Sequence, residues 1–292
     1  MGDFKMATVH FERAIAEYDP ERDRDARFPF GQDTKAAAAA FLSYPYWVVG
    51  RLEEARALSD SANAWAGELA HDPSLANAWT YTAFLEILRG DAGAALQAAD
   101  LGIEVSRRRD LAFYLLWGQI LACYARGRLF EPEAGAKELR EALGAWLERG
   151  NKFFAPWIYG MIADLEAMTG RVDNALASTE AGLALANETG DRWTDAVLHR
   201  LRGDILLKRD PAKPALAEEA FKTAIVIAKQ QGARSHQLLA ALAQAKLYQS
   251  TGRPADAHAV LAPALEGFAP TPEMPEIAEA QALRGELSNR AG

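Results

Sequence analysis

The sequence has 292 residues, of which 50% are hydrophobic and 25% are charged, and its formal net charge is −8 at pH 7. Because a negative protein repels phosphate backbones and anionic lipids, we expect neither nucleic acid nor a membrane surface as a partner. The single cysteine, Cys123, excludes an intramolecular disulfide and a cysteine metal cluster. The sequence contains neither a long apolar run nor a secretory signal pattern, so we expect a cytoplasmic protein.

Residues 1–19 begin the chain with a pattern that recurs further along it. Gly2, Ala7, Phe11 and Ala14 provide a turn glycine, an alanine five residues later, a bulky residue and a second small residue. These positions match the second helix of a pair whose first helix is missing. We therefore expect a truncated repeat in a fragment of a longer polypeptide, with an uncovered apolar face through which the chain could form a homodimer.

Residues 33–268 contain turns spaced by about 40 residues. The residues in the turn positions are Gly50, Gly90, Gly127, Gly170, Asp210 and Gly252. Small residues lie seven positions before five of these turns, namely Ser43, Ala83, Ala163, Gly203 and Ala245. Alanine lies five positions after most of them, at Ala55, Ala95, Ala175 and Ala257. Two antiparallel helices that pack closely require such small side chains at their contact, so each unit is predicted to be a helical hairpin.

The turns predict six helix pairs, over 33–70, 73–107, 110–149, 153–189, 193–231 and 233–268. The third pair matches the pattern least well, because residues 128–135 lengthen its turn. A proline-rich link follows at 269–275, and residues 276–292 are predicted to form a capping helix and tail. The predicted fold is all-α, with about six hairpins, a period of about 40 residues and a C-terminal capping helix.

These residues resemble the tetratricopeptide motif, which pairs two helices in each repeat. The clearest matches are Trp79-x3-Ala83, Leu42-Ser43-x2-Tyr46-x3-Gly50 and Ala217-x3-Phe221-x2-Ala224. The resemblance implies a right-handed α-solenoid, with units about six residues longer than the standard repeat of about 34.

Four stretches resemble the C-terminal repeat region of large bacterial multidomain regulators. They are residues 11–22 (FERAIAEYDPER), 31–33 (GQD), 198–207 (LHRLRGDILL) and 228–235 (AKQQGARS). In that family a class III adenylate or guanylate cyclase or a winged-helix domain precedes a signal-transduction ATPase and then the repeats. The resemblance implies a regulatory role in a bacterial signalling protein, with cyclase and ATPase domains as intramolecular partners.

The sequence lacks the motifs of the common enzyme and metal sites. It contains no G-x-x-x-x-G-K-[ST] phosphate loop, no H-E-x-x-H and no G-x-S-x-G, and its five histidines are scattered. We therefore expect no catalytic residues, no cofactor and no metal in this chain.

Stacked helical pairs present their first helices on a concave surface, which suits a protein or peptide partner. The predicted groove residues are Tyr44, Trp47, Asn77, Phe84, Trp157, Asp164, Arg200, Asp204 and Lys246. An equally good interpretation of the aromatic members is that they pack between helices. Two alternative functions stay open: a small-molecule sensor, in which the groove closes around a metabolite, and an oligomerisation module.

Overall fold

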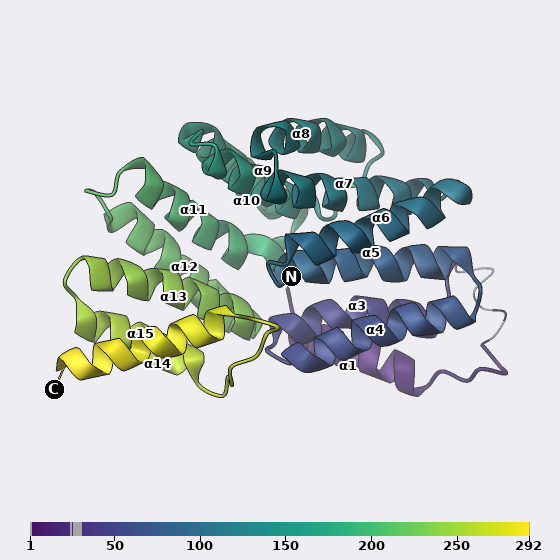
Figure 1. The fold of residues 1–292 in the computed structure, drawn as a ribbon, viewed down its shortest axis with the longest axis horizontal. Helices are drawn as coiled ribbons and strands as arrows, with labels where there is room; N and C mark the ends of the chain where they lie inside the picture. The colour runs from purple at the N-terminus through teal and green to yellow at the C-terminus, as the bar shows by residue number, and fades with distance from the viewer. Residues whose placement is uncertain (1, 24, 26–30, 292) are drawn as a thin grey trace. The chain divides into compact units, whose positions relative to one another are not determined.

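A computed structural model describes residues 2–23, 25 and 31–291 (Figure 1). The fold is all-α: the residues that the structure describes are 79% helical, in 14 α-helices, and form no strand. The chain divides into two compact units. The N-terminal unit comprises Phe4–Trp47 and Arg51–Gly150, and the C-terminal unit comprises Asn151–Gly292 with the short segments Met1–Asp3 and Val48–Gly50.

The helices of each unit follow one another as packed neighbours. The N-terminal unit contains α1 (Phe4–Ala16), α3 (Thr34–Val48), α4 (Leu52–Glu68), α5 (Asp72–Leu88), α6 (Ala92–Arg108), α7 (Ala112–Leu129) and α8 (Pro132–Glu148). The C-terminal unit contains α9 (Ala155–Met168), α10 (Val172–Thr189), the 3₁₀ turn η1 (Arg192–Thr194), α11 (Asp195–Arg209), α12 (Ala215–Gln231), α13 (Arg234–Ser250), α14 (Pro254–Leu265) and α15 (Glu276–Ala291). Each of the six predicted ranges corresponds to two of these helices. Helices α5 and α6 extend one residue beyond each end of the range 73–107, and the largest difference at an outer end is three residues, at 268 against Leu265.

Helices contact the next helix along the chain, and several also contact the helix after that. Helix α5 contacts both α6 and α7, and within the C-terminal unit α9 contacts α11, α11 contacts α13, and α13 contacts α15. Figure 1 shows the C-terminal helices alternating between two layers, so that α11, α13 and α15 are successive members of one layer. Within the C-terminal unit, each hairpin therefore packs against the next one.

The turns after α5 and α9 share one hydrogen-bond pattern. After α5, Gly90 takes a positive φ of 78°, and Asp91 N donates to Glu86 O at 3.0 Å. After α9, Gly170 has φ 76°, and Arg171 N donates to Glu166 O at 3.0 Å. This arrangement satisfies carbonyls that the end of a helix would otherwise leave unpaired, and glycine tolerates the positive φ.

Gly127 does not form the third turn, so this sequence-based assignment is wrong. Gly127 is buried inside α7, which continues to Leu129, and the turn lies at Phe130 and Glu131. Helix α8 then begins at Pro132, whose fixed φ suits a first helical position and whose missing N–H is not needed there.

The small residues of the predicted seams are buried where two helices approach closely. A Cβ atom added to Gly182 of α10 would lie 3.0 Å from Pro156 O and 3.1 Å from Tyr159 Cβ of α9. A Cβ atom added to Gly203 of α11 would lie 2.6 Å from Cδ1 of the fully buried Phe221 of α12. These contacts explain why the seams contain glycine and alanine.

Aromatic rings form much of the core of the N-terminal unit. The Phe84 ring lies 6.1 Å from the Trp117 ring, and Trp117 lies 5.5 Å from Trp146, measured between centroids. Each of these three side chains is at most 1% exposed. They join α5, α7 and α8 into one interior.

Helix α1 packs against α3 through two ring contacts, Phe4 with Tyr44 at 5.6 Å and Phe11 with Phe41 at 5.8 Å. Its opposite side exposes Met6 and Val9, which are 50% and 54% exposed. Whether this side of α1 serves to join two copies of the chain stays a prediction.

No described helix is both long enough and apolar enough to cross a membrane.

Candidate functional site

Three of the predicted groove residues line one concave site in the C-terminal unit. Arg200 and Asp204 come from α11 and Lys246 comes from α13, and they border a cavity of about 490 Å³. We call this site the C-terminal hollow. Its lining comprises Arg200, Asp204, Leu207, Leu239, Leu242, Ala243, Lys246, Leu247, Ser250, Glu276 and Glu279.

Helical spacing brings these side chains to one surface. On α13, the lining residues Leu239, Ala243, Lys246 and Ser250 are separated by three or four positions, so they form one stripe along the helix. The α11 residues follow the same steps, and α15 contributes Glu276 and Glu279 from its first turn. Each of the three helices therefore presents a single face to the hollow.

Aliphatic side chains provide most of the apolar lining. Leu242 and Leu247 are buried, with 3% and 5% of their surface exposed, whereas Leu207, Leu239 and Ala243 are partly exposed. Partly exposed leucines beside a cavity offer apolar area that a ligand can remove from water.

Charged residues at the hollow form two ion pairs. Arg200 Nη1 donates to Asp204 Oδ2 at 2.7 Å along α11, and Lys246 Nζ lies 2.6 Å from Glu279 Oε1, joining α13 to α15. Lys246 and Glu279 are about half exposed, at 50% and 51%. The second pair is therefore open to solvent, where an ion pair contributes little to stability and can be exchanged.

The Asp204 carboxyl group is surrounded by many protein atoms in addition to its ion-pair partner, Arg200. Burial raises the pKa of its carboxyl, and the positive charge of Arg200 opposes that rise. Asp164 of α9 raises the pKa further by like-charge repulsion, while Lys208 and Lys246 lower it. The hollow thus combines a low-dielectric wall with opposed charges, and 35% of the Asp204 side chain is still reachable by water.

Glu276 has no counter-ion among the residues that the structure describes, and it is half-buried at the start of α15. Glu276 therefore adds to the hollow a carboxylate that forms no ion pair with Arg200 or Lys246.

Glu276 and Glu279 are not among the predicted groove residues, because residues 276–292 are predicted only as a capping helix and tail. The repeat period contains the signal that finds Glu279: Leu239 lies 39 residues after Arg200, and Glu279 lies 40 residues after Leu239. These three residues occupy corresponding positions on α11, α13 and α15, and all three line the hollow. Helix α15 therefore occupies the position of another first helix.

The predicted aromatic residues do not line an exposed groove. Trp47, Phe84 and Trp157 are 2%, 0% and 5% exposed, so they belong to the core. Asn77 is 1% exposed, and Tyr44 is half-buried with its ring 5.1 Å from Phe84. The reason is that each of these side chains lies on a helix covered by its neighbours within the array.

The one predicted groove residue not yet described, Asp164, is half-buried on α9 and acts electrostatically on Asp204. Asp164 lies 40 residues before Asp204, so it occupies the corresponding position one repeat earlier.

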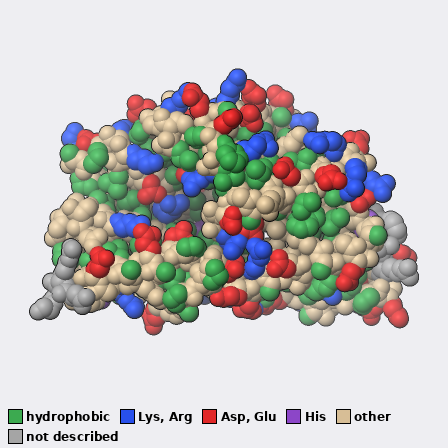
Figure 2. All heavy atoms as spheres, in the orientation of Figure 1, with side chains coloured by type: hydrophobic (Ala, Val, Ile, Leu, Met, Phe, Trp, Pro, Cys, Tyr) green, Lys and Arg blue, Asp and Glu red, His purple; other side chains and the backbone are tan. Residues whose placement is uncertain are grey.

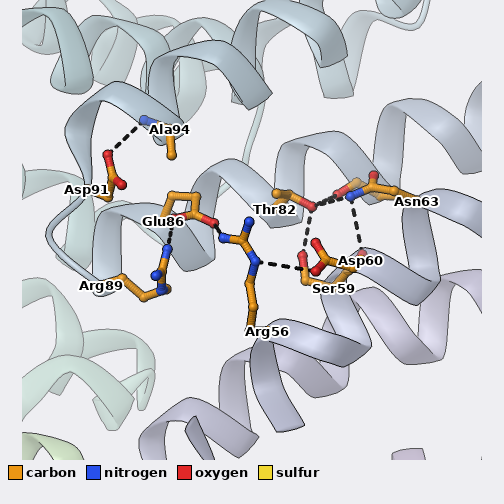
Figure 3. Close-up of polar contacts among 10 residues, drawn as sticks. Arg56, Ser59, Asp60, Asn63, Thr82, Glu86, Arg89, Asp91 and Ala94 are labelled. Carbon is orange, nitrogen blue, oxygen red and sulfur yellow. Dashed lines mark hydrogen bonds and ion pairs between the residues drawn. The ribbon is translucent and has the colours of Figure 1, made fainter. Parts of the chain in front are cut away.

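A second polar cluster lies in the N-terminal unit, between α4 and α5 (Figure 3). The Glu86 carboxylate of α5, 2% exposed, pairs with Arg56 of α4 and with Arg89 of its own helix. Nearby, Ser59 and Thr82 share a hydrogen bond of 2.8 Å, and Asn63 Nδ2 donates to Thr82 Oγ1 at 2.8 Å. Because these ion pairs and hydrogen bonds join side chains of α4 to side chains of α5, we interpret the cluster as a structural link between the two helices.

Two buried ionisable residues, Cys123 and His236, have pKa values that favour their neutral forms. Burial raises the pKa of the Cys123 thiol to about 12, and Cys123 Sγ donates to Gly135 O at 3.4 Å. Burial lowers the pKa of His236 to about 3. A neutral thiol and a neutral imidazole at these sites are poor nucleophiles or proton carriers. Within the described ranges, no group of three or more His, Cys, Asp or Glu side chains is arranged to hold a metal ion.

Comparison with known proteins identifies a distant relative of this chain. No protein-family model matches the chain. A protein of Rhizobium meliloti (strain 1021) described as uncharacterised is 23% identical over 234 residues, which cover 80% of this chain. The matched part is 23% of the relative's length, so this chain spans less than a quarter of that protein.

Proposed function

We propose that this chain is a non-catalytic, tetratricopeptide-like binding module that holds a peptide segment of a partner protein in the C-terminal hollow. The observation that carries the proposal is the hollow itself: partly exposed leucines bordered by solvent-accessible ion pairs on three alternate helices. Apolar anchors supply affinity at such surfaces, and charges around them fix the register of the bound segment.

The packing of alternate helices supports the solenoid part of the proposal. Contacts of α9 with α11, of α11 with α13 and of α13 with α15 fit an array in which first helices line one surface. The Schellman-type turns after α5 and α9 add a local feature that recurs with the repeat. In this model α15 is both the cap of the array and a wall of its binding site.

A regulatory role in a bacterial signalling protein is part of the same proposal. The relative from Rhizobium meliloti, of which this chain spans 23%, motivates a search for the module in longer polypeptides with cyclase or ATPase domains. Binding in the hollow would regulate such domains only if the ligand had different affinities for two states of the whole protein.

The experiment is a selection of short peptides from a random library on the purified chain, followed by affinity measurement with two matched variants. Leu239→Ser removes apolar lining from the hollow, whereas Leu216→Ser removes a leucine on α12 that is 54% exposed and lies outside it. Loss of an apolar anchor is expected to weaken binding by about 30-fold or more, since a hot spot contributes at least about 2 kcal/mol. The control variant should bind as the wild type does. Equal affinities for Leu239→Ser and wild type would refute the assignment of the hollow.

The second candidate is a small-molecule sensor, favoured by the size of the hollow. A cavity of about 490 Å³ falls within the range of small-ligand sites, roughly 300–1,000 Å³. Thermal unfolding across a metabolite panel distinguishes the two, because a ligand that binds only the folded state raises the melting temperature. A metabolite whose stabilisation is lost in Leu239→Ser would replace the peptide proposal.

A further inference from the structure

The balance of charge in the C-terminal hollow narrows the chemistry of its ligand. Two cationic side chains, Arg200 and Lys246, and three carboxylates, Asp204, Glu276 and Glu279, line it, so one negative charge is in excess. Each cation already has a carboxylate within ion-pair distance, at 2.7 Å and 2.6 Å. An incoming anion would therefore have to displace a carboxylate from its cation, whereas an incoming cation finds Glu276 available.

The residues around the hollow do not reverse this balance. Asp164 and Lys208 both act on Asp204 and carry opposite charges, so they add no net charge. Figure 2 shows acidic, basic and hydrophobic side chains intermixed over this part of the surface, and neither sign forms a continuous patch. The chain as a whole has a formal net charge of −8, which attracts cationic partners over longer distances.

The apolar lining sets the second requirement for the ligand. Leu207, Leu239 and Ala243 are partly exposed beside the cavity, and burial of this area favours an aliphatic group. The cation must therefore be attached to an aliphatic body, or lie next to one.

We propose that the C-terminal hollow binds a peptide segment that presents an aliphatic side chain next to a lysine or arginine, with Glu276 as the acceptor of the cation. This inference rests on the proposed peptide-binding function and specifies the charge of the peptide. The Lys246–Glu279 pair moderates the affinity, because Lys246 repels the incoming cation while it holds the Glu279 carboxylate.

The test uses three labelled, end-capped peptides that share the same leucines and differ in the residues beside them, which are lysine, glutamine or glutamate. Fluorescence anisotropy with the whole chain measures their affinities at low and at high salt. The lysine peptide should bind most tightly, and salt should reduce its advantage over the glutamine peptide.

Two variants should change the affinity for the lysine peptide in opposite directions. Glu276→Gln should weaken binding and Lys246→Met should strengthen it, each by about 1.5- to 5-fold, the range of solvent-exposed charge pairs. The matched control is Glu219→Gln, an exposed carboxylate on α12 outside the hollow, which should change nothing.

The outcomes separate this inference from the function on which it rests. If the glutamine or glutamate peptide binds as well as the lysine peptide, the charge inference is wrong and the peptide-binding function stands. If none of the three binds, both are wrong. If n-hexylamine, an aliphatic cation without a peptide backbone, binds as tightly as the lysine peptide, the ligand is a small amine and the peptide inference is refuted.

Discussion

Gly203→Ala tests the close packing of α11 against α12. The added methyl group would lie 2.6 Å from Phe221 Cδ1 and 2.9 Å from Cζ, well inside van der Waals contact. The ring is enclosed by Leu206, Ala217, Ala220 and Leu247, so it has little space to move away. Because the contact is so short, we expect an overpacking cost of about 2–3 kcal/mol, the upper part of the usual range.

Helix propensity opposes that cost. Alanine is favoured over glycine in a helix interior by about 0.8–1.0 kcal/mol, so the net loss in the free energy of unfolding should be about 1–2 kcal/mol. The control is Gly285→Ala in α15, where the glycine is exposed and no atom beyond its chain neighbours and the adjacent backbone of α15 lies within 4 Å of the added Cβ. That variant should gain up to about 1 kcal/mol, so the two variants should differ by about 2–3 kcal/mol, which measures the clash.

The assay is urea denaturation followed by circular dichroism at the helical band. Phe221→Leu, added to Gly203→Ala, should restore part of the lost stability, because the smaller side chain makes room for the methyl group. The reasoning fails if Gly203→Ala proves as stable as Gly285→Ala, since the two helices would then not approach as closely as described.

Four further predictions concern the core and its ionisable groups. Because folding lowers the pKa of His236 from 6.5 to about 3, the unfolded state binds a proton that the folded state excludes. The free energy of unfolding should therefore fall by up to about 1.4 kcal/mol per unit as pH decreases from about 6.5 towards 3. In urea titrations across this range, His236→Gln should show a shallower dependence, and an unchanged slope would contradict the assignment. Cys123 should resist iodoacetamide in the folded protein and react after denaturation, as mass spectrometry can show; rapid labelling of the native chain would mean that the thiol is accessible. Glu86→Ala should cost about 2–3 kcal/mol, less than for a fully buried pair because Arg56 is 38% exposed. Glu104→Ala, which removes an exposed partner of Arg108 at 3.8 Å, should cost less than about 0.5 kcal/mol, and equal losses would contradict the structural role of Glu86. Phe84→Ala should cost about 3–5 kcal/mol in the same assay, whereas a ring that served only to bind a ligand could be removed without loss of stability.

The helical pairs were predictable because each one repeats the same packing problem. Ala83, Ala163 and Ala245 recur at corresponding positions and are all fully buried, since the contact between two helices leaves no room for a larger side chain. The third turn was not predictable from glycine alone. Gly127 lies inside a helix, and the signal that starts α8 is the proline at position 132.

The C-terminal hollow could be predicted in part. Arg200, Asp204 and Lys246 follow from the face of each first helix that points away from its small packing residue. The same rule failed for Phe84 and Trp157, because an aromatic ring long enough to reach a groove also reaches the neighbouring helix, and burial favours the latter. Glu276 comes from a helix whose role is set by packing on α13 and α14, which the local sequence does not specify.

The tryptophan contact in the N-terminal core has a spectroscopic consequence. The Trp117 and Trp146 rings lie 5.5 Å apart with an angle of 37° between their planes, close enough for their electronic transitions to couple. Coupled indoles in a fixed, non-parallel orientation give paired circular dichroism bands that disappear when the rings separate. The N-terminal unit therefore contains an intrinsic optical reporter, which can follow its unfolding separately from the loss of helix elsewhere in the chain.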